Sequence, residues 1–533
     1  MSKKIFTSDE LVEIIRLTYQ EKRSSRYIAG VFGVGKSTVG DFLRKETYTD
    51  FWKAYEEKPV ASGEILTPDD VRKSLSGKRF VFTSAQNNTY VHDKFLKALE
   101  GYCDHNNAEL IIGTFHYNKK GFQKGSSEGE WYDPKIRKYI LDESREIAEG
   151  LLWAGELNIV PSAVNPISGL HNYTNRNSGI IPHAKLQLES LPTPKHDPCR
   201  MMYTTGAVTQ RNYIEMKAGQ KAKHHHSFSA LVVEIDEDGS WFVRQLCAEK
   251  LTGCFFDLEY YYTPKGIGMD GEPCCVEAIN FGDIHAAKLD HQVAESSWGD
   301  NANSIMSCLQ PEHVFLHDVM DHRNRNHHNI KDPYFRFKMF NNQTESVEEE
   351  VQLTASVIEN MTGKGAKVVV VESNHDLALS RWLKEQDYKQ DPVNAIFFLD
   401  LQLATYLAIK ANEDFSIFEY ACKMVNSELD DVLFLRTDES YNICGDIECG
   451  AHSHNGNNGA RGSVMAFQKQ GIKANIGHSH SATIKDGVYQ AGVSGLLDMG
   501  YNIGGSSWSH SHIVTYSNGK RAIITLKDGK WRG

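Results

Sequence analysis

The sequence has no hydrophobic run long enough to cross a membrane. A membrane-spanning helix needs about 18 or more consecutive apolar residues, and no such run occurs among the 533 residues. The first residues, Met1 to Ile5, lead into charged sequence instead of the apolar core of a secretion signal. We therefore expect a cytoplasmic protein that binds no membrane.

Cysteine never occurs in the spacing of a zinc site. The 10 cysteines are scattered, and no C-x-x-C pair is present. Cys274 and Cys275 are adjacent, which suits neither an ordinary disulfide nor a structural zinc ion. We expect reduced, mostly buried thiols.

Positive charge is also in deficit. The chain has 58 Lys and Arg against 69 Asp and Glu, which gives a formal net charge of -11. A general electrostatic attraction to nucleic acid is therefore excluded. Any DNA binding must depend on local basic patches or on metal ions.

The pattern of expected elements divides the chain into four segments. Residues 1–50 are predicted to form a small helical domain, and residues 51–75 a polar linker. Residues 76–275 are predicted to form a middle α/β region whose role the sequence does not assign. In residues 276–533 expected strands alternate with helices. The predicted fold class is α/β with an all-α N-terminal unit.

Within the middle region, a β-α-β order is expected near its start. Residues 79–83 and 109–113 are rich in β-branched and aromatic residues and predict strands. The helical pattern at residues 91–99 predicts a helix between them. Residues 136–154 are also predicted to be helical.

A series of polar clusters follows the expected strands of residues 276–533. Ligand sites in α/β sheets form just beyond the carboxyl ends of strands, so this repeated placement predicts one site. The clusters are Asp283-Ile284-His285, His317-Asp318-Val319-Met320-Asp321-His322, Ser373-Asn374-His375-Asp376, His452-Ser453-His454 and Gly477-His478-Ser479-His480.

Hydrolysis of a phosphate ester explains these residue types. Two metal ions about 3.5–4 Å apart neutralise the phosphoryl oxygens and supply a nucleophile near neutral pH. Asp-x-His and His-x-His on extended backbone place both side chains on one side. Carboxylate, amide and imidazole ligands without thiolate suit Mn²⁺ best, with Mg²⁺, Fe²⁺ or Zn²⁺ as alternatives. One carboxylate must bridge the two ions.

The order D-x-H, D-x-x-D, N-H-D, H and G-H-x-H, from about residue 277 to 485, resembles the calcineurin-like metallophosphoesterase superfamily. The resemblance implies a two-sheet α/β sandwich. It also implies that Asp318 bridges the two metals. The first metal would be held by Asp283, His285 and His480, and the second by Asn374, His452 and His478.

The resemblance further implies the catalytic residues. His375 would face the scissile phosphate as general acid or charge stabiliser, and Asp321 would orient it. His454 remains an alternative to His452. Three positions depart from the family pattern: His317 and Ser373 stand where glycine is usual, and His322 stands where arginine is common.

Several basic residues near these clusters are candidate phosphate contacts. They are His322, Arg323, Arg325 and Arg461, with solvated loops as the competing interpretation. The run His224-His225-His226 is expected to be an exposed loop and not a ligand set.

Residues Gly30 to Ser37 match the phosphate-loop pattern G-x-x-x-x-G-K-S. A phosphate loop follows a buried strand, whereas residues 24–29 are polar and helix-like, so no nucleotide cofactor is expected. Residues 25–44 instead resemble a helix-turn-helix of the resolvase or transposase kind. The candidate DNA contacts are Arg26, Lys36, Ser37, Thr38 and Arg44, and a three-helix interaction module is the alternative.

A helix-turn-helix combined with a two-metal esterase suggests a nuclease. The whole chain resembles the host-DNA-degradation proteins of T-five-like bacteriophages. That resemblance implies a manganese-dependent deoxyribonuclease in the host cytoplasm, with DNA as partner and a homo-oligomeric state.

Two other functional classes stay open. One is a metallophosphatase or phosphodiesterase acting on protein or small-molecule phosphoesters, with the N-terminal unit used for assembly. The other is a DNA-binding regulator with a vestigial metal site.

Overall fold

A computed structural model describes residues 6–19, 25–45, 47–48, 78–119, 130–195, 197–268 and 276–533. The chain forms two compact units, Met1–Ser76 and Gly77–Gly533. The predicted linker at 51–75 lies outside the described residues, as do Cys274 and Cys275. Within the described ranges, no helix is both long and apolar enough to pass through a bilayer.

The N-terminal unit contains three described helices, α1 (Ser8–Tyr19), α2 (Ser25–Phe32) and α3 (Lys36–Leu43). Residues 33–35 lie between α2 and α3, in agreement with the helix-turn-helix resemblance of residues 25–44. Ile14, Ile28 and Phe42 are fully buried and hold the three helices together, while Val31 faces solvent. The phosphate-loop pattern therefore spans a helix end, a turn and a helix start, without a preceding strand.

The second unit begins with the predicted β-α-β order. Strand β1 (Arg79–Gln86), helix α6 (Asp93–Asn106) and β2 (Ala108–Phe115) follow one another, and β1 pairs with β2 in parallel. The other edge of β1 pairs with β8 (Ser229–Ile235), which pairs with β9 (Trp241–Cys247). The α/β fold class is thus confirmed.

The helix predicted over residues 136–154 is wrong. A short 3₁₀ turn, Pro134–Tyr139, is followed by strands β3 (Ser144–Ala148) and β4 (Leu151–Ala154). Gly150 has a φ of +76°, which permits the tight turn between the strands. Pairing of β3 with β4, and of β4 with β5, therefore overrides the local helical pattern.

A six-stranded sheet positions the predicted site. In spatial order its strands are β16 (Leu433–Leu435), β15 (Lys367–Val371), β14 (His313–His317), β13 (Val276–Asn280), β22 (Ser511–Tyr516) and β23 (Arg521–Thr525). Strands β13 to β16 are parallel, so their carboxyl ends share one edge. Each strand sends alternate side chains to opposite faces.

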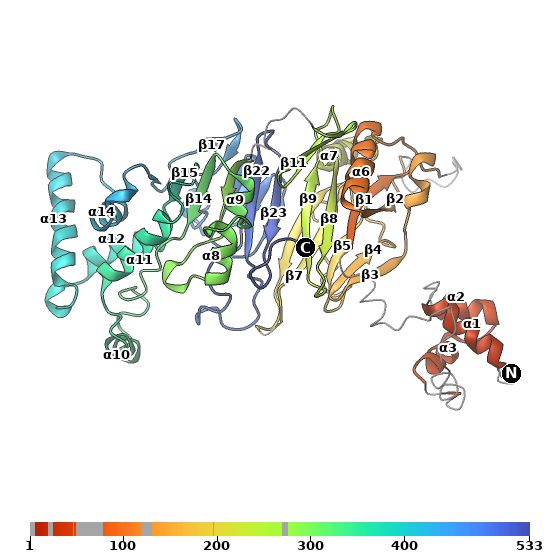
Figure 1. Cartoon of the computed structure of the whole chain (residues 1–533), viewed down its shortest axis with the longest axis horizontal. Helices are drawn as coiled ribbons and strands as arrows, with labels where there is room; N and C mark the ends of the chain where they lie inside the picture. The colour runs from red at the N-terminus through yellow and green to blue at the C-terminus, as the bar shows by residue number, and fades with distance from the viewer. Residues whose placement is uncertain are drawn as a thin grey trace. The chain divides into compact units, whose positions relative to one another are not determined.

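Helices cover one face of this sheet. Val314 and Leu316 pack against apolar side chains of helices on that face, and Figure 1 shows several of these helices beside β14 and β15. Phe315 points to the other face and packs with Ile443 and Ile447 of a second sheet. The covering helices are α8 (His291–Trp298), α9 (Ile305–Leu309), α11 (Val347–Glu359), α12 (Leu377–Glu385), α13 (Ala395–Ala411) and α14 (Ile417–Val425).

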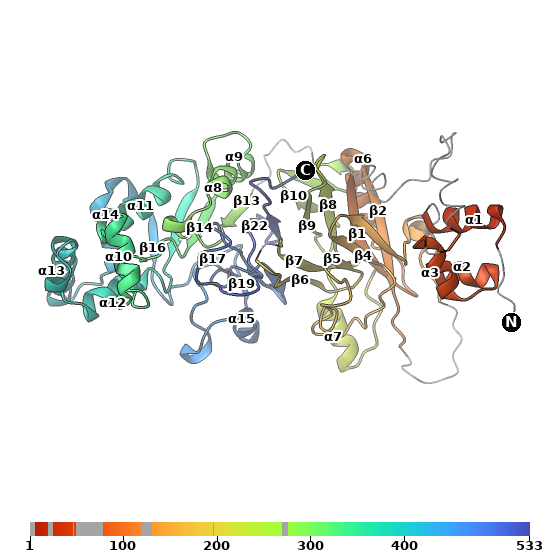
Figure 2. The same ribbon diagram turned by 90° about the horizontal axis from the view of Figure 1, so that it is seen from below.

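The second sheet has ten strands drawn from both halves of the unit, as Figure 2 shows for β17, β19, β6 and β7. Strand β20 pairs with β6, so residues on both sides of position 276 share one sheet. In order, its strands are β17 (Asn442–Ile443), β18 (Ile447–Glu448), β19 (Lys473–Ile476), β21 (Val488–Gln490), β20 (Thr483–Lys485), β6 (Leu186–Leu191), β7 (Arg200–Thr205), β5 (Ser178–Ile181), β4 and β3.

A buried polar network ties the two large sheets together. The Asn475 side-chain amide donates to Asn280 Oδ1 at 2.8 Å and to Thr515 Oγ1 at 3.0 Å, and Arg521 donates to Asn475 Oδ1 at 2.9 Å. These bonds fix β19 relative to β13 and β22, just before the loops that carry the site. The remaining described α-helices and strands are α7 (Lys217–His225), β10 (Phe255–Asp257), β11 (Tyr260–Thr263), β12 (Gly266–Ile267), α10 (Pro333–Asn341) and α15 (Val464–Gln470).

Candidate metal centre

The loops after five strands bring the predicted ligand residues together. In three overlapping groups of side chains, the potential ligand atoms lie within 4.8 Å of one another. The first group is Asp283, His285, Asp318 and His480, the second is Asp318, His452 and His478, and the third is His285, Asp321 and His375. Asp318 belongs to the first and second groups, as expected of a bridging carboxylate.

The first group converges on a small volume. The Nε2 atoms of His285 and His480 lie 3.0 Å apart, and His480 Nε2 lies 3.1 Å from Asp283 Oδ2. His285 Nε2 is 3.7 Å from Asp318 Oδ2. Two imidazole nitrogens and two carboxylates therefore point at one location, which is the arrangement of a cation site.

The second group contains His452 and not His454. His452 Nε2 lies 3.5 Å from Asp318 Oδ2, and the His452 side chain is buried. His454 is half-buried, and its Nε2 is hydrogen bonded to the side-chain amide of Asn455 at 3.0 Å. Of the two alternatives left open by the sequence, the geometry favours His452.

The donor atoms fit divalent metal ions. Asp283 Oδ1, Asp318 Oδ1, Asn374 Oδ1 and both His452 ring nitrogens are buried without a hydrogen-bond partner among the described residues. Each buried polar atom without a partner costs about 1–3 kcal/mol, so such a cluster needs a reason. Bound cations would satisfy the three oxygens and one ring nitrogen of His452, and oxygen and nitrogen ligands of this kind suit Mn²⁺, Fe²⁺ or Zn²⁺.

Asp321 supports this cluster through His285. Its Oδ1 accepts a hydrogen bond from His285 Nδ1 at 2.8 Å. In the neutral ring this bond places the proton on Nδ1, so Nε2 is the nitrogen that can bind a metal. Carboxylate support of this kind is common for metal-binding histidines.

His375 lies beside the ligands, as predicted, but the carboxylate of Asp321 does not orient it. His375 Nδ1 donates instead to the backbone oxygen of Asp321 at 3.2 Å. A carbonyl oxygen can only accept, so Nδ1 must carry a proton. His375 therefore has Nε2 available for proton exchange, and the carboxylate of Asp321 is engaged with His285.

The buried charges stabilise one another. Burial raises the pKa of Asp283, but nearby His452 and His480 outweigh this and lower it to about 2. Burial lowers the pKa of His285, but Asp321 and Asp318 outweigh this and raise it to about 9. Metal binding through His285 Nε2 therefore requires the loss of a proton.

The backbone of the site is unusually constrained. His285, Asp318, His478 and His480 have φ values of 51°, 48°, 80° and 59°, a region that non-glycine residues seldom occupy. Such strain concentrates at functional sites, where the surrounding structure maintains it. A Cβ on Gly477 would lie 2.2 Å from Asp283 Oδ1, so this position requires glycine.

Ser373 has a structural role that explains the departure from glycine. Its Oγ accepts from Asp376 N at 3.2 Å, and Asp376 Oδ2 accepts from Ser373 N at 3.0 Å. Asp376 Oδ1 also accepts from Met320 N at 3.1 Å. This reciprocal pair resembles a capping box and holds the turn that presents Asn374 and His375.

Of the candidate phosphate contacts, the structure places Arg461 at the site. Arg461 lines a cavity together with Asp318 and His375. Arg325 is buried, and its guanidinium donates to both carboxylate oxygens of Asp391 at 2.6 and 2.8 Å. His322 is buried against the Trp382 ring, and Arg323 lies over the Phe335 ring. Arg325 therefore has a structural ion pair instead of a free guanidinium.

The run His224–His226 is not an exposed loop, contrary to expectation. His224 and His225 end helix α7, and His226 is almost fully buried. His226 lies 2.6 Å from the Tyr213 hydroxyl and 2.9 Å from the Thr209 carbonyl oxygen. These contacts make it a hydrogen-bonded core residue.

The candidate DNA contacts of the N-terminal unit lie on its surface. Arg26, Lys36, Ser37 and Arg44 are exposed, and Thr38 is half-buried at the start of α3. Arg44 is also paired with Asp41 at 2.6 Å. The buried side chains of α3, Val39 and Phe42, face the helical core.

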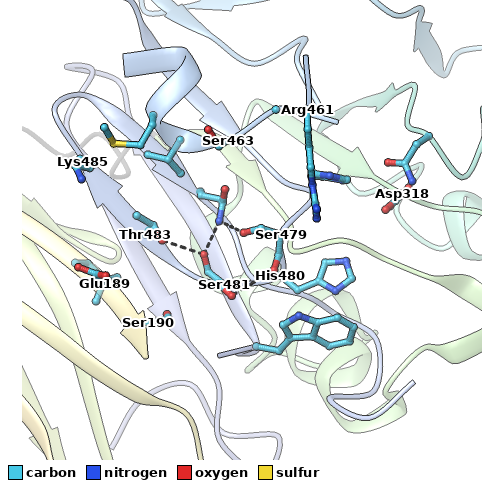
Figure 3. Close-up of a pocket in the computed structure, with 18 of the residues that line it drawn as sticks. Glu189, Ser190, Asp318, Arg461, Ser463, Ser479, His480, Ser481, Thr483 and Lys485 are labelled. Atoms are coloured by element: carbon cyan, nitrogen blue, oxygen red, sulfur yellow. Dashed lines mark hydrogen bonds between the residues drawn. The ribbon is translucent and has the colours of Figure 1, made fainter. Parts of the chain in front are cut away.

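Sequence reasoning missed the residues that form the cavity beside the metal ligands. They come from strands β6 and β20, the loop after Arg461 and the segment around residues 501–508 (Figure 3). Ser190 is separated by almost 300 residues from Ala482, whose carbonyl its hydroxyl contacts at 2.7 Å. No local pattern could have shown this juxtaposition, because it depends on the pairing of β6 with β20.

No protein-family model matches the chain. It is, however, 42% identical to Protein A1 of Escherichia phage T5 over 491 residues, which covers 89% of this chain and 86% of that protein. The chain belongs to the Protein A1 family. This result confirms the resemblance to a protein of T-five-like bacteriophages. The name Protein A1 says nothing of an activity, so any function for this member of the family must be argued from its site.

Proposed function

We propose that this protein is a two-metal phosphodiesterase that hydrolyses DNA. The observation that carries the proposal is the convergence of two ligand groups on the shared carboxylate Asp318. Both groups contain buried potential ligand atoms that have no hydrogen-bond partner. The two large sheets that flank the site are consistent with the metallophosphoesterase sandwich that the sequence suggested. Mn²⁺ is the metal that we propose, on the basis of the ligand chemistry.

Each side chain would have a distinct task. Asp283, His285 and His480 would hold one ion, Asn374, His452 and His478 the other, and Asp318 would contact both. Bound divalent ions supply charge neutralisation at the phosphoryl oxygens and a nucleophile near neutral pH. Asp321 keeps His285 in the tautomer that leaves Nε2 free, through its 2.8 Å hydrogen bond.

His375 would act on the leaving group. Its Nδ1 proton is committed to the Asp321 carbonyl, so only Nε2 can give a proton to the departing oxygen. His375 lines the same cavity as Asp318 and Asn374, which supports a position beside a phosphate held by the ligands. As a cation it would also stabilise charge on the transferred group.

DNA is the substrate that we infer, with the N-terminal unit as a recruiting element. The three helices expose Lys36 and Ser37 at the start of α3, where a recognition helix contacts DNA. A net charge of -11 makes such a local basic element necessary for binding a polyanion. Membership of a bacteriophage protein family supports a role in the host cytoplasm, such as degradation of host DNA.

The decisive experiment compares metal-dependent hydrolysis of three substrates. Duplex DNA, single-stranded DNA and an aryl phosphodiester are incubated with Mn²⁺ or with excess chelator. We expect Mn²⁺-dependent cleavage of DNA that is abolished by Asp318→Asn. Asp104→Asn, on the exposed surface of α6, is the matched control and should retain full activity.

The alternatives give different results in the same assay. Cleavage of the aryl phosphodiester without cleavage of either DNA would favour a metallophosphatase or small-molecule phosphodiesterase. DNA binding without hydrolysis of any substrate would favour a regulator with a vestigial metal site. Full activity of Asp318→Asn, or activity in excess chelator, would reject the two-metal mechanism.

A further inference from the structure

A cavity of about 560 Å³ opens beside the metal ligands. It extends from Asp318 and His480 to Lys485 at the end of β20, and Figure 3 shows Asp318 and Lys485 on opposite sides of the view. This volume lies within the range of small-molecule sites and exceeds what a phosphate group alone requires. The space beyond the scissile phosphate is therefore shaped for a further part of the substrate.

One wall of this cavity is aromatic. The Trp508 ring packs edge-on against the His480 ring, with centroids 4.2 Å apart, and Tyr501 packs against Trp508 at 5.7 Å. Both rings line the cavity, and Tyr501 is 55% exposed. Packing against His480 would be a sufficient reason for a tryptophan at position 508. It does not explain Tyr501, which lies beside Trp508 and remains more than half exposed.

A polar wall, braced by internal hydrogen bonds, adjoins the aromatic one. The Gln490 side-chain amide donates to the Ser481 carbonyl at 2.6 Å and to the Ser479 hydroxyl, and the Ser481 hydroxyl lies 2.7 Å from that of Ser507. Thr483 also contributes its side chain to the cavity. Hydroxyl and amide groups fixed in this way suit a sugar–phosphate backbone better than an apolar ligand.

Two cations of the cavity have no counter-ion. Arg461 and Lys485 both line it, and neither forms an ion pair with any residue that the structure describes. Asp486, next to Lys485 in sequence, pairs with Lys185 at 2.7 Å, and Glu189, which also lines the cavity, lies 3.6 Å from His171. The cavity therefore combines an aromatic wall, a hydroxyl-rich wall and free positive charge.

We propose that this cavity holds the nucleoside next to the scissile phosphate. The base lies against Trp508 and Tyr501, the sugar lies along the Ser479–Thr483 wall, and the next phosphate is bound by Lys485, while Arg461, on the Asp318 side of the cavity in Figure 3, contacts the scissile phosphate. Stacking on aromatic rings accepts any base, because every base has a π face. The proposal rests on the phosphodiesterase function proposed above and adds the group that the enzyme recognises.

A consequence concerns base pairing. A base inside the cavity cannot remain stacked and paired in a duplex, so the strand must open locally before cleavage. Ends, mismatches and single-stranded regions should therefore be cut faster than an intact duplex. A phosphopeptide would present no base, and the aromatic wall would then contribute little.

The test uses a dinucleoside monophosphate and two analogues. In each analogue, hydrogen replaces a different one of the two bases. kcat/KM is measured with Mn²⁺ for the full chain and for Trp508→Leu. We expect removal of one particular base to lower kcat/KM about 5- to 150-fold, the range of a single stacking contact. Trp508→Leu should cause a similar loss with the complete substrate and almost none with that analogue.

Two further variants keep the result interpretable. Tyr501→Leu tests the same wall without touching a metal ligand, in case Trp508→Leu disturbs His480 and lowers the Mn²⁺ content. Trp131→Leu is the control, because that ring packs on Tyr90 and does not line the cavity.

The outcomes separate the two proposals. Equal cleavage of all three substrates by the natural chain, or equal losses on all of them in Trp508→Leu and Tyr501→Leu, would overturn the nucleoside site and leave the phosphodiesterase intact. No Mn²⁺-dependent cleavage of any of them, nor of DNA, would overturn the phosphodiesterase itself. A phosphopeptide substrate cleaved in preference to all three would also reject the nucleoside site.

Discussion

At the scale of single residues, His375 and Asp321 have separable roles although they touch. His375→Ala should leave Mn²⁺ affinity unchanged, because the ring belongs to neither group that contains Asp318 and its Nδ1 is hydrogen bonded to the Asp321 carbonyl. It should slow DNA cleavage about 10²- to 10⁴-fold, the usual effect of losing a positioned acid. Isothermal titration with Mn²⁺ and single-turnover cleavage measure the two properties. Loss of the metal in His375→Ala would show that the ring is a ligand.

Asp321→Asn should have the opposite pattern, with a larger effect on Mn²⁺ affinity than on cleavage. The carboxylate supports His285, whereas the contact to His375 comes from the Asp321 backbone, which the substitution keeps. We expect Mn²⁺ affinity to fall about 10- to 100-fold, as for other supporting carboxylates. Cleavage at saturating Mn²⁺ should be less affected than in His375→Ala. Unchanged Mn²⁺ affinity in Asp321→Asn would contradict this assignment.

Glu350 gives a prediction on pH and stability. Its two carboxylate oxygens accept from Arg323 N at 2.6 Å and from Asn324 N at 3.2 Å, in a buried setting. Burial raises its pKa to about 7, although those two N–H groups act to lower it. The folded chain therefore holds this proton more tightly than the unfolded chain. The associated stabilisation is present below about pH 4.5 and is lost as the pH rises to about 7.

Glu350→Gln should remove this pH dependence. Between pH 5 and 7, the free energy of unfolding of the natural chain should fall more steeply than that of the variant, by up to about 1.4 kcal/mol per pH unit. Urea titrations at several pH values provide the measurement. Glu348→Gln, exposed on the same helix α11, is the control and should keep the natural slope. Identical slopes in Glu350→Gln and the natural chain would refute the raised pKa.

At the scale of elements, helix α3 determines whether the N-terminal unit binds DNA. Lys36 is exposed at the first position of α3, and one phosphate contact changes the log–log salt slope of duplex binding by about 0.9. Lys36→Glu should therefore weaken DNA binding and flatten its salt dependence. Hydrolysis of an aryl phosphodiester should not change, because no metal ligand is altered.

The control for this experiment is Lys97→Glu, which reverses an exposed charge on α6 of the other unit. Fluorescence anisotropy of labelled duplex DNA at several salt concentrations reports both affinity and slope. If Lys36→Glu and Lys97→Glu have the same affinity and slope, the helical unit is an assembly module. The role given to Lys36, Ser37, Thr38 and Arg44 must then be abandoned.

At the scale of the whole molecule, we expect a homo-oligomer in which copies of the chain contact one another through helix α13. Leu403 and Leu407 are more than half exposed, together with Ile396, Tyr406 and Ile409. The opposite side of the helix packs into the core through Phe398 and Leu401. A helix that is apolar on all sides is normally buried on all sides. Figures 1 and 2 both show α13 at the edge of its unit, beyond α12 and α14.

The charges on α13 favour a second copy as the partner. Asp400 and Lys410 are both exposed, near opposite ends of the apolar stripe. In an antiparallel pair of α13 helices related by a two-fold axis, Asp400 of each copy would face Lys410 of the other. Asp400→Lys should weaken association, and the exchanged pair Asp400→Lys with Lys410→Asp should restore it.

Sedimentation velocity measures the oligomeric state directly. Leu403→Glu with Leu407→Glu should shift the protein to a smaller species. Leu251→Glu, at an isolated leucine that is 80% exposed, should not. A natural chain that remains a monomer, or an unchanged oligomer in the double variant, would show that α13 does not join copies of this chain.

Much of the site could be predicted from the sequence alone, because its proposed metal-binding residues follow strands. Residues such as Asp283, Asp318 and Asn374 closely follow buried strands, and parallel strands must bring their carboxyl ends to one edge. The helix-turn-helix over residues 25–44 was likewise predictable from local apolar spacing and the glycine turn. These features depend on interactions close in sequence.

Tertiary structure alone decided the features that depend on distant pairing. Residues 144–154 became strands because a neighbouring strand was available, despite their helical pattern. The choice of His452 over His454, and of His285 as the contact of the Asp321 carboxylate, required side-chain positions that spacing cannot specify. The cavity beside the metal ligands required β6 to pair with β20 across almost 300 residues. Local sequence carries no information on such contacts, because their energy arises only when the sheets are assembled.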